Sequence, residues 1–536
     1  MFNERTQHDS PSPRRLRRRS RVSSREGGAA KRSGLAWRFF LDECRVSVGR
    51  CSLALAASLL AGCASYVEQR SPEENEGVPQ APATFAHGGE AQGNKAVSFG
   101  ADQWWRVYGD MALNSLMLRL SESNPDLQAA LARVDQSHAA LGVTRGPLLP
   151  TVTSDASAGR RRDAVNNLLF PIATPEYERY RLGMSASWEL DLWGRVRGAV
   201  RRDSFRAEAA ELDYQAVLLS MQGDLARQYF AARTAMMELA ILREAHELRS
   251  ANLQLQESRL ELGSGVEIDV SRARVELNNA RAAEEAAVRN LGRLRHGIAA
   301  LIGQAPSEFD IDLSAGTSDV KGDQLRVPLG VPSELLIRRA DVRAADRNFR
   351  AAAVQVGIRK ADFLPRITLN GSGGVASLKT SNLFDAGSGF FDVGPQVDVP
   401  LFQSGRRRSS VEEAKALWRE AAAGYRGALL NAVREVDDAL LDLKSLGREA
   451  GARRDARVAA ERAAVAARDR HESGLASYFE FIEAERDRLQ AKLADNALKG
   501  EQRAASVNLI QALGGGWRAK SVDEASPRTV QSEANR

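Results

Sequence analysis

The feature that most constrains this chain is an abrupt change of periodicity at Trp188-Glu-Leu-Asp-Leu-Trp-Gly-Arg195. Before it, from about Arg179 to Leu190, apolar side chains alternate with polar ones. That period of two is typical of a strand with one apolar and one wet face. After it, residues 195–262 contain no proline and are rich in helix formers, which predicts one very long helix. The octapeptide therefore marks a joint between a strand and a rod.

The same succession of elements recurs in the second half of the chain. Leu149-Pro150 matches Leu364-Pro365 at an offset of 215 residues, and the glycine at 263 matches the one at 474 at an offset of 211. The joint has a weaker counterpart at residues 397–406. Because the matched glycines and prolines fall at the ends of expected elements, chance similarity between alanine-rich helices does not explain them. We interpret the pattern as an internal duplication.

Four segments have the alternating pattern of strands, near residues 151–161, 179–190, 366–375 and 391–399. Each has about ten residues, the length that crosses a bilayer when the strand is tilted. Four strands cannot close a barrel, and open strand edges are not tolerated in lipid, so several copies must contribute. Three copies give twelve strands, an even number within the usual range. A soluble two-sheet sandwich is the alternative, but four strands are few beside such long helices.

The predicted fold class is a membrane α+β protein. It is a trimeric 12-stranded outer-membrane β-barrel, with four strands per protomer, continuous with a long periplasmic α-helical barrel. The expected parts are an N-terminal extension with a lipoprotein signal peptide (1–62), a lipid-anchored linker (63–100), a first repeat with a helix, two strands and a long helical hairpin (101–305), an inter-repeat linker (306–332), a second repeat (333–517) and a polar tail (518–536).

All three cysteines, Cys44, Cys51 and Cys63, precede the predicted body, which excludes a disulfide framework or a thiolate metal site within it. The apolar run at 53–62 has the length of a signal-peptide core rather than of a spanning helix. Its end, Leu60-Ala-Gly-Cys63, resembles a bacterial lipobox, in which the cysteine is acylated and becomes the mature N-terminus. A leader of ordinary length would begin near residue 46 or 48, so we expect a translation start later than Met1.

Charge and motifs argue against a nucleic-acid partner and against catalysis. The first 62 residues hold 13 Lys/Arg and 5 Asp/Glu, so the net charge of +6 becomes −2 over the remainder. The arginine run at 14–19 therefore has no support in the predicted body. We find no phosphate-binding glycine loop, no nucleophile–histidine–acid arrangement and no histidine spacing suited to a metal. The sequence predicts no enzyme, no cofactor and no metal site.

The chain resembles the TolC-like outer-membrane efflux channels, in particular the NodT-like lipoprotein branch of systems with an RND-type pump. The resemblance covers about residues 100–517 and rests on the lipobox, Trp104-Trp-Arg-Val-Tyr-Gly-Asp110, Asn124-Pro-Asp-Leu-Gln-Ala-Ala130 and the octapeptide at 188–195. It implies a homotrimer in the outer membrane, anchored by lipid at Cys63, with a large periplasmic part. It also implies a periplasmic adaptor (membrane fusion) protein and an inner-membrane pump, with proton drive as the expected energy source.

The implied function is passive conduction of small molecules, such as drugs and toxic compounds, from the adaptor and pump to the exterior. A type I protein-secretion channel of the same architecture is one alternative. A lipid-anchored coiled-coil scaffold without a pore is another, although the four alternating segments argue against it. The sequence leaves open the substrate, the gate latch and the resting state of the channel.

Candidate site residues lie at the hairpin tips and the joint. An acid follows each tip glycine by six residues, at Asp269 and Glu480, and Glu483 lies one turn further on. In a trimer these acids would form rings that favour cations, although first-turn acids stabilised by a helix dipole are the alternative. Residues expected to serve the turns and adaptor docking are Gly263, Gly265, Gly474 and Leu475. Residues expected to shape the joint are Trp188, Asp191, Leu192, Trp193, Gly194 and Arg195.

Overall fold

The computed structural model describes residues 85–86, 103–162, 176–313 and 338–515. All of them belong to one of two compact units, Cys63–Arg536. The lipobox, with Cys63, and the polar tail expected after 517 lie outside the described residues. Among the described helices, none is both long enough and apolar enough to span a membrane.

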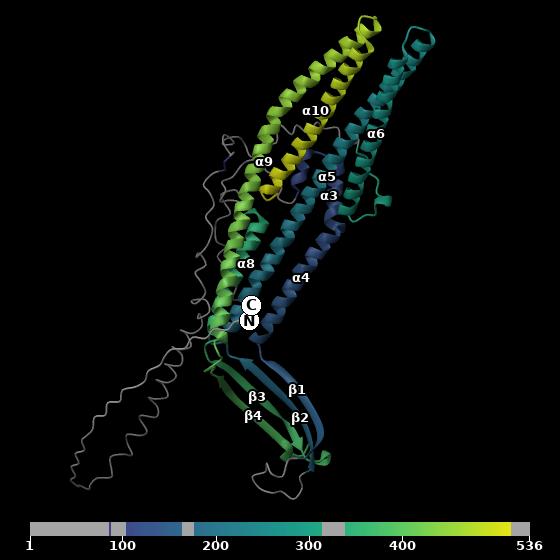
Figure 1. The fold of residues 1–536 in the computed structure, drawn as a ribbon. Coiled ribbons are helices and arrows are strands. Elements are labelled where there is room, and N and C mark those ends of the chain that lie inside the picture. Colours follow the sequence, from purple (N-terminus) through teal and green to yellow (C-terminus); the bar gives the residue numbers. More distant parts are fainter. Residues whose placement is uncertain (1–84, 87–102, 163–175, 314–337, 516–536) are drawn as a thin grey trace, which may run out of the picture. The chain divides into compact units, whose positions relative to one another are not determined.

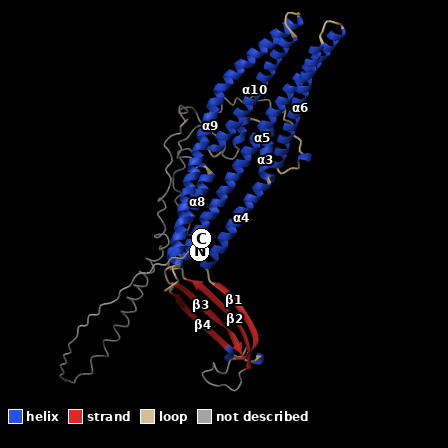
Figure 2. Cartoon of the chain, viewed as in Figure 1, coloured by secondary structure: helices blue, strands red, loops and turns tan. Residues whose placement is uncertain are grey.

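The helices and strands follow one another in the order expected from the sequence (Figures 1 and 2). The first half contains η1 (Trp104–Tyr108), α3 (Met111–Ser123), α4 (Pro125–Arg145), η2 (Gly146–Leu148), β1 (Thr151–Arg162), β2 (Glu176–Glu189), α5 (Arg195–Glu261) and α6 (Glu267–Leu301). The second half contains η4 (Pro306–Glu308), α8 (Ala340–Ala361), β3 (Arg366–Ser377), η6 (Thr380–Asn382), η7 (Ala386–Ser388), β4 (Gly389–Asp398), α9 (Arg406–Glu472) and α10 (Tyr478–Ala512).

The two halves match in the lengths of their helices. Both α5 and α9 have 67 residues, and both α6 and α10 have 35. At about 1.5 Å per residue, the longer pair measures roughly 100 Å. The predicted long helix after the joint is therefore confirmed.

The four strands form one antiparallel sheet in the order β1-β2-β3-β4. Residues directly opposite each other share a face, so Leu182 beside Val375 and Trp188 beside Leu369 belong to one face of the sheet. That face is apolar and unshielded: its exposed side chains include Val152, Leu182, Met184, Leu369, Phe391, Val393 and Val397. The other face carries Ser185 beside Ser372 and Ser187 beside Asn370. The alternation predicted for the strands is confirmed.

The motif at 104–110 attaches the short N-terminal helices to the long ones. The Trp104 indole donates to Gln222 Oε1 on α5 (3.1 Å), and the Tyr108 hydroxyl lies 2.8 Å from Ser506 Oγ on α10. Both aromatic rings are almost fully buried, in a core that includes Phe230 and Ile298.

Asp110 completes this attachment with three hydrogen bonds. Its carboxylate accepts from the backbone amide of Leu113 (3.0 Å), which caps α3, and from Tyr229 Oη and Arg233 Nη1 on α5 (2.7 Å each). Burial, and then the bond to Asp110, raise the pKa of Tyr229, so this phenol stays protonated. A carboxylate that is 3% exposed is tolerated here because all these donors converge on it.

We expect Asp110→Asn to destabilise the protein by roughly 3 kcal/mol, because it removes the carboxylate from a buried ion pair with Arg233. Thermal unfolding followed by circular dichroism would measure the loss. The control is Asp126→Asn, which changes an exposed acid in the first turn of α4. Equal melting temperatures for the two variants would contradict the role assigned to Asp110.

Candidate functional site

Asp191 precedes the long helix α5 and caps its N-terminus with its side chain. Its backbone has φ +45°, and its carboxylate accepts from the backbone amides of Val196 (2.8 Å) and Arg197 (2.9 Å). These amides lie in the first turn of α5, where no helical carbonyl is available to them. The N-cap residue itself is Gly194, at φ +74°. Asp191 therefore supplies the side-chain cap that glycine cannot provide.

Two tryptophans fix the joint to neighbouring turns. The Trp188 indole donates to the Leu148 carbonyl before β1 (3.1 Å), and the Trp193 indole donates to the Pro365 carbonyl before β3 (2.6 Å). Trp193 also packs on a small core that includes Ile358 of α8. The joint thus contacts the turns that precede two other strands, while Leu192 is half-buried within it.

An arginine clamps the strand end to the helix start. Arg195 Nε and Nη2 donate to the two carboxylate oxygens of Glu189 (3.0 and 2.5 Å), and this interaction raises the pKa of the guanidinium. Arg197 in turn pairs with Asp191 at 3.2 Å. Both cations of the first joint are therefore neutralised by carboxylates of the same segment.

The second joint is built differently. Seven residues (399–405) connect β4 to α9, whereas five (190–194) connect β2 to α5. The left-handed residues are Ser404 (φ +46°) and Gly405 (φ +81°), and Arg406 donates to the Gln403 amide oxygen at 3.0 Å. In the described chain, no carboxylate takes the place of Asp191 at the start of α9.

Each long hairpin turns through a glycine with positive φ. At the first tip, Gly263 has φ +74°; its amide donates to the Leu260 carbonyl (3.0 Å) and the Ser264 amide donates to the Arg259 carbonyl (2.9 Å). Gly474, at φ +75°, and Leu475 repeat this pair of bonds at the second tip. This pair of backbone hydrogen bonds is the usual way of ending a helix at a left-handed glycine.

Gly265 at the first tip lacks space for a side chain, which is a different constraint from the positive φ of Gly263. A Cβ atom at this position would lie 2.8 Å from the Leu260 backbone nitrogen. The tip nevertheless exposes large apolar side chains, with Leu262 82% and Leu475 73% exposed. Both tips are thus glycine-based turns that carry exposed apolar side chains.

The three predicted aperture acids all lie in the first two turns of α6 and α10, and each pairs with an arginine of its own hairpin. Glu480 is 3.1 Å from Arg470, and Asp269 is 3.9 Å from Arg272. Glu483 is 2.6 Å from Arg486. The sequence interpretation missed these arginines, although the i,i+3 spacing of two of the pairs was visible.

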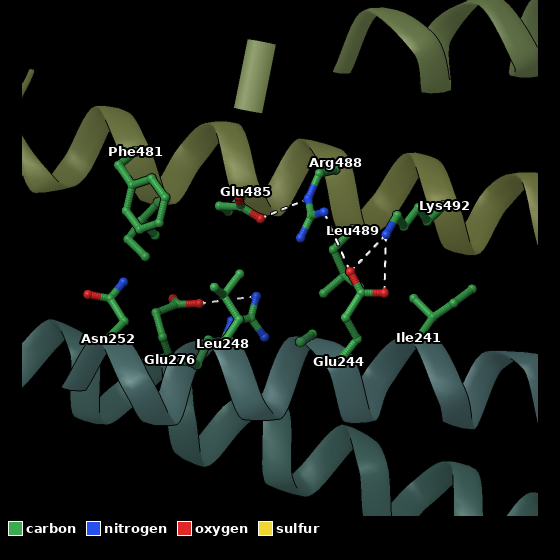
Figure 3. A pocket seen from close by; sticks show the side chains of 13 residues that line it. Ile241, Glu244, Leu248, Asn252, Glu276, Phe481, Glu485, Arg488, Leu489 and Lys492 are labelled. Carbon is green, nitrogen blue, oxygen red and sulfur yellow. Dashed lines mark hydrogen bonds and ion pairs between the residues drawn. The ribbon is translucent and has the colours of Figure 1, made fainter. Parts of the chain in front are cut away.

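A buried charge network behind the tips was not predicted. Glu276 of α6, 5% exposed, accepts from Arg486 of α10 and lies 3.5 Å from Arg249 of α5. Figure 3 shows the neighbouring part, where Arg488 reaches Glu485 (2.9 Å).

Further along the same interface, Lys492 and Arg488 of α10 approach Glu244 of α5, at 3.0 and 3.5 Å. A cavity of about 20 Å³ lies among these residues, enough for about one water molecule. Burial, followed by the Glu276 and Asp269 carboxylates, raises the pKa of Tyr478 to about 12. The network links the two long hairpins close to their tips.

An amphipathic four-stranded sheet joined to two long helical hairpins is the architecture of a TolC-like channel subunit. The chain belongs to the outer membrane efflux protein family, whose model matches residues 116–304 and 331–515. The solvent efflux pump outer membrane protein SrpC of Pseudomonas putida is 29% identical over 469 residues, which is 87% of this chain and 98% of SrpC.

Solved structures give the same result. The outer-membrane channel OprN has a TM-score of 0.75 and 31% identity, covering 84% of this chain and 98% of OprN. The outer membrane protein VceC of Vibrio cholerae has a TM-score of 0.71 and 27% identity, covering 78% of this chain and 100% of VceC. The expected family, efflux role and outer-membrane location are therefore confirmed.

We expect Asp191→Ala to loosen the first turn of α5 by about 1 kcal/mol, because two backbone amides lose their acceptor. Hydrogen exchange at Val196 and Arg197 should accelerate about fivefold, and Asp191→Asn should recover much of the protection, since an amide oxygen also caps. Asp398→Ala, at the end of β4, is the control. Unchanged exchange in Asp191→Ala would show that its carboxylate is dispensable.

Proposed function

We propose that three copies of this chain form a closed 12-stranded barrel in the outer membrane, through which the efflux pathway leaves the cell. The observation that carries the proposal is the open sheet, whose edge strands β1 and β4 each have a single described neighbour and whose apolar face is unshielded. Pairing β4 of one copy with β1 of the next removes both edges. Three copies supply an even number of strands in the usual range.

The long helices would continue the barrel as a tunnel. Because α5 follows β2 and α9 follows β4, the symmetry of the strands is passed on to the helices at each joint. The roughly 100 Å of α5 and α9 is enough to project deep into the periplasm. The equal lengths of the helices in the two halves support an internal duplication, in which each half contributes two strands and one hairpin.

The partners would be a periplasmic adaptor and an inner-membrane pump, expected to be proton-driven. SrpC is named as the outer membrane protein of a solvent efflux pump, which supports small molecules as the transported class. The exposed tip residues, among them Leu475, are the candidate docking surface for the adaptor. The chain would conduct passively, with substrate choice made mainly in the pump.

Asp269, Glu480 and Glu483 are the candidate aperture acids. Each lies near a hairpin tip, and threefold symmetry would repeat each as a ring. Their arginine partners reduce the net charge of these rings. The hydrogen bonds and ion pairs behind the tips would have to rearrange when the aperture dilates.

The first experiment measures single-channel currents in planar bilayers. We expect the wild-type protein to form a cation-preferring pore, and Asp269→Ala combined with Glu480→Ala to raise conductance or lower the cation preference. The preference falls because the substitutions remove two acids and leave Arg272 and Arg470 without these partners.

The control pair is Asp438→Ala with Glu449→Ala, two exposed acids in the middle of α9. Currents of the tip variant that match the wild type would remove both acids from the aperture. Absence of any pore in the wild-type protein would refute the channel itself.

Lipid attachment would be at Cys63. We expect Cys63→Ser to abolish labelling by a lipid probe, because the serine hydroxyl does not replace the thiol that is acylated. Cys51→Ser, in the same leader, should be labelled normally. Mass spectrometry of the mature N-terminus provides the second measurement, and normal labelling of Cys63→Ser would refute the lipobox.

A further inference from the structure

We propose that the second joint binds the anionic headgroups of phospholipids in the periplasm-facing leaflet of the outer membrane, through Arg406, Arg407 and Arg408. The proposal rests on the proposed function, in that the sheet lies in the membrane and the joint therefore lies at its periplasmic surface. Its evidence is the difference between the two joints.

The second joint exposes an apolar anchor. The apolar row of β4, at Phe391, Val393 and Val397, continues beyond the strand to Val399 and Leu401. In the single chain, Leu401 is 91% exposed and the adjacent Phe402 is 85% exposed. By contrast, the first joint is half-buried, with its tryptophans bonded to other turns.

Three consecutive arginines follow this anchor. Arg406 donates to the Gln403 amide oxygen, and among the described residues neither Arg406 nor Arg407 forms an ion pair with a carboxylate, whereas the charge of Arg408 helps to lower the pKa of Glu412 one turn further along α9. The nearest acids along the chain are Asp398, which accepts from Gln396 (3.2 Å), and Glu412, which accepts from Lys415 (2.9 Å) and is also stabilised by the charge of Arg408. The positive charges of Arg406 and Arg407 are therefore available to an outside partner, and that of Arg408 is available in part.

A neighbouring copy does not offer the missing carboxylates. If β4 pairs with β1 of the next copy, the second joint faces the segment before β1, residues 145–151. That segment contains Arg145 and no acid. The carboxylates of the neighbour's first joint, Glu189 and Asp191, already bind Arg195 and Arg197.

A phospholipid matches both parts of this surface, because its acyl chains can contact the apolar side chains and its phosphate can bind the arginines. Apolar side chains followed by cations match the order of acyl chains and phosphates across a membrane interface, and binding strength grows with both contributions. A single Arg near an anionic lipid surface contributes about a fivefold preference, so three acting independently contribute about a hundredfold at most, and less where Glu412 attracts Arg408. The first joint has no such surplus, because each of its cations is paired internally.

The test uses the purified full-length protein in detergent, mixed with equal amounts of phosphatidylglycerol and phosphatidylcholine. Native mass spectrometry counts the lipids retained on the assembly. We expect phosphatidylglycerol to be enriched on the wild type by at least about 25-fold, the product of the fivefold contributions of Arg406 and Arg407. Arg406→Gln with Arg407→Gln and Arg408→Gln should lose the enrichment, and the same three positions changed to Lys should keep it, because the charge is retained.

The matched control changes three exposed arginines in the middle of α9: Arg448→Gln, Arg453→Gln and Arg454→Gln. It should keep the wild-type enrichment. The single variant Arg407→Gln, with an expected loss of about fivefold, serves if the triple variant does not assemble.

Equal retention of both lipids by the wild type overturns the proposal, as does undiminished enrichment in the triple Gln variant. Loss of the trimer with enrichment intact also overturns it, since the arginines would then serve a contact between copies. The conductance of the wild-type protein, recorded from the same preparation, tests the proposed channel separately. Lipid retention does not depend on pore opening, so failure of one proposal can be distinguished from failure of the other.

Discussion

The open edges of a four-stranded sheet are the constraint on which the rest of the structure depends. Strands β1 and β4 each present a row of backbone groups that no further described strand pairs. Such rows are not tolerated in lipid and invite aggregation in water. Pairing with further copies, as proposed above, would remove them. Because five or seven residues connect each strand to its long helix, any symmetry of the strands is imposed on the helices as well.

The two joints meet the same geometric demand with different chemistry. In the first, Asp191 caps α5 and Glu189 holds Arg195, so the segment neutralises its own charges. In the second, Ser404 and Gly405 make the turn through left-handed backbone, and among the described residues Arg406 and Arg407 form no ion pair with a carboxylate. The two halves thus differ where a strand leaves the sheet, while their hairpin tips share the same glycine-based ending.

Most elements could be predicted because their signals are local. The start of α5 at Arg195 and its end before Gly263 follow from helix formers, a proline-free run and a glycine suited to left-handed backbone. The faces of the strands follow from their alternation. By contrast, the partners of the candidate aperture acids were missed. Local spacing hints at Arg486 beside Glu483, but nothing local reveals that Arg486 also binds Glu276, 210 residues away.

The sequence by itself determined the order and type of the elements, the apolar face of the sheet and the family, because periodicity and turn residues act over a few positions. The tertiary structure alone decided which charges are paired and which stay free. Tyr108 meets Ser506 across 398 residues, and the buried network joins three helices. Such contacts depend on how the long helices pack, since only packing brings distant residues within hydrogen-bonding distance.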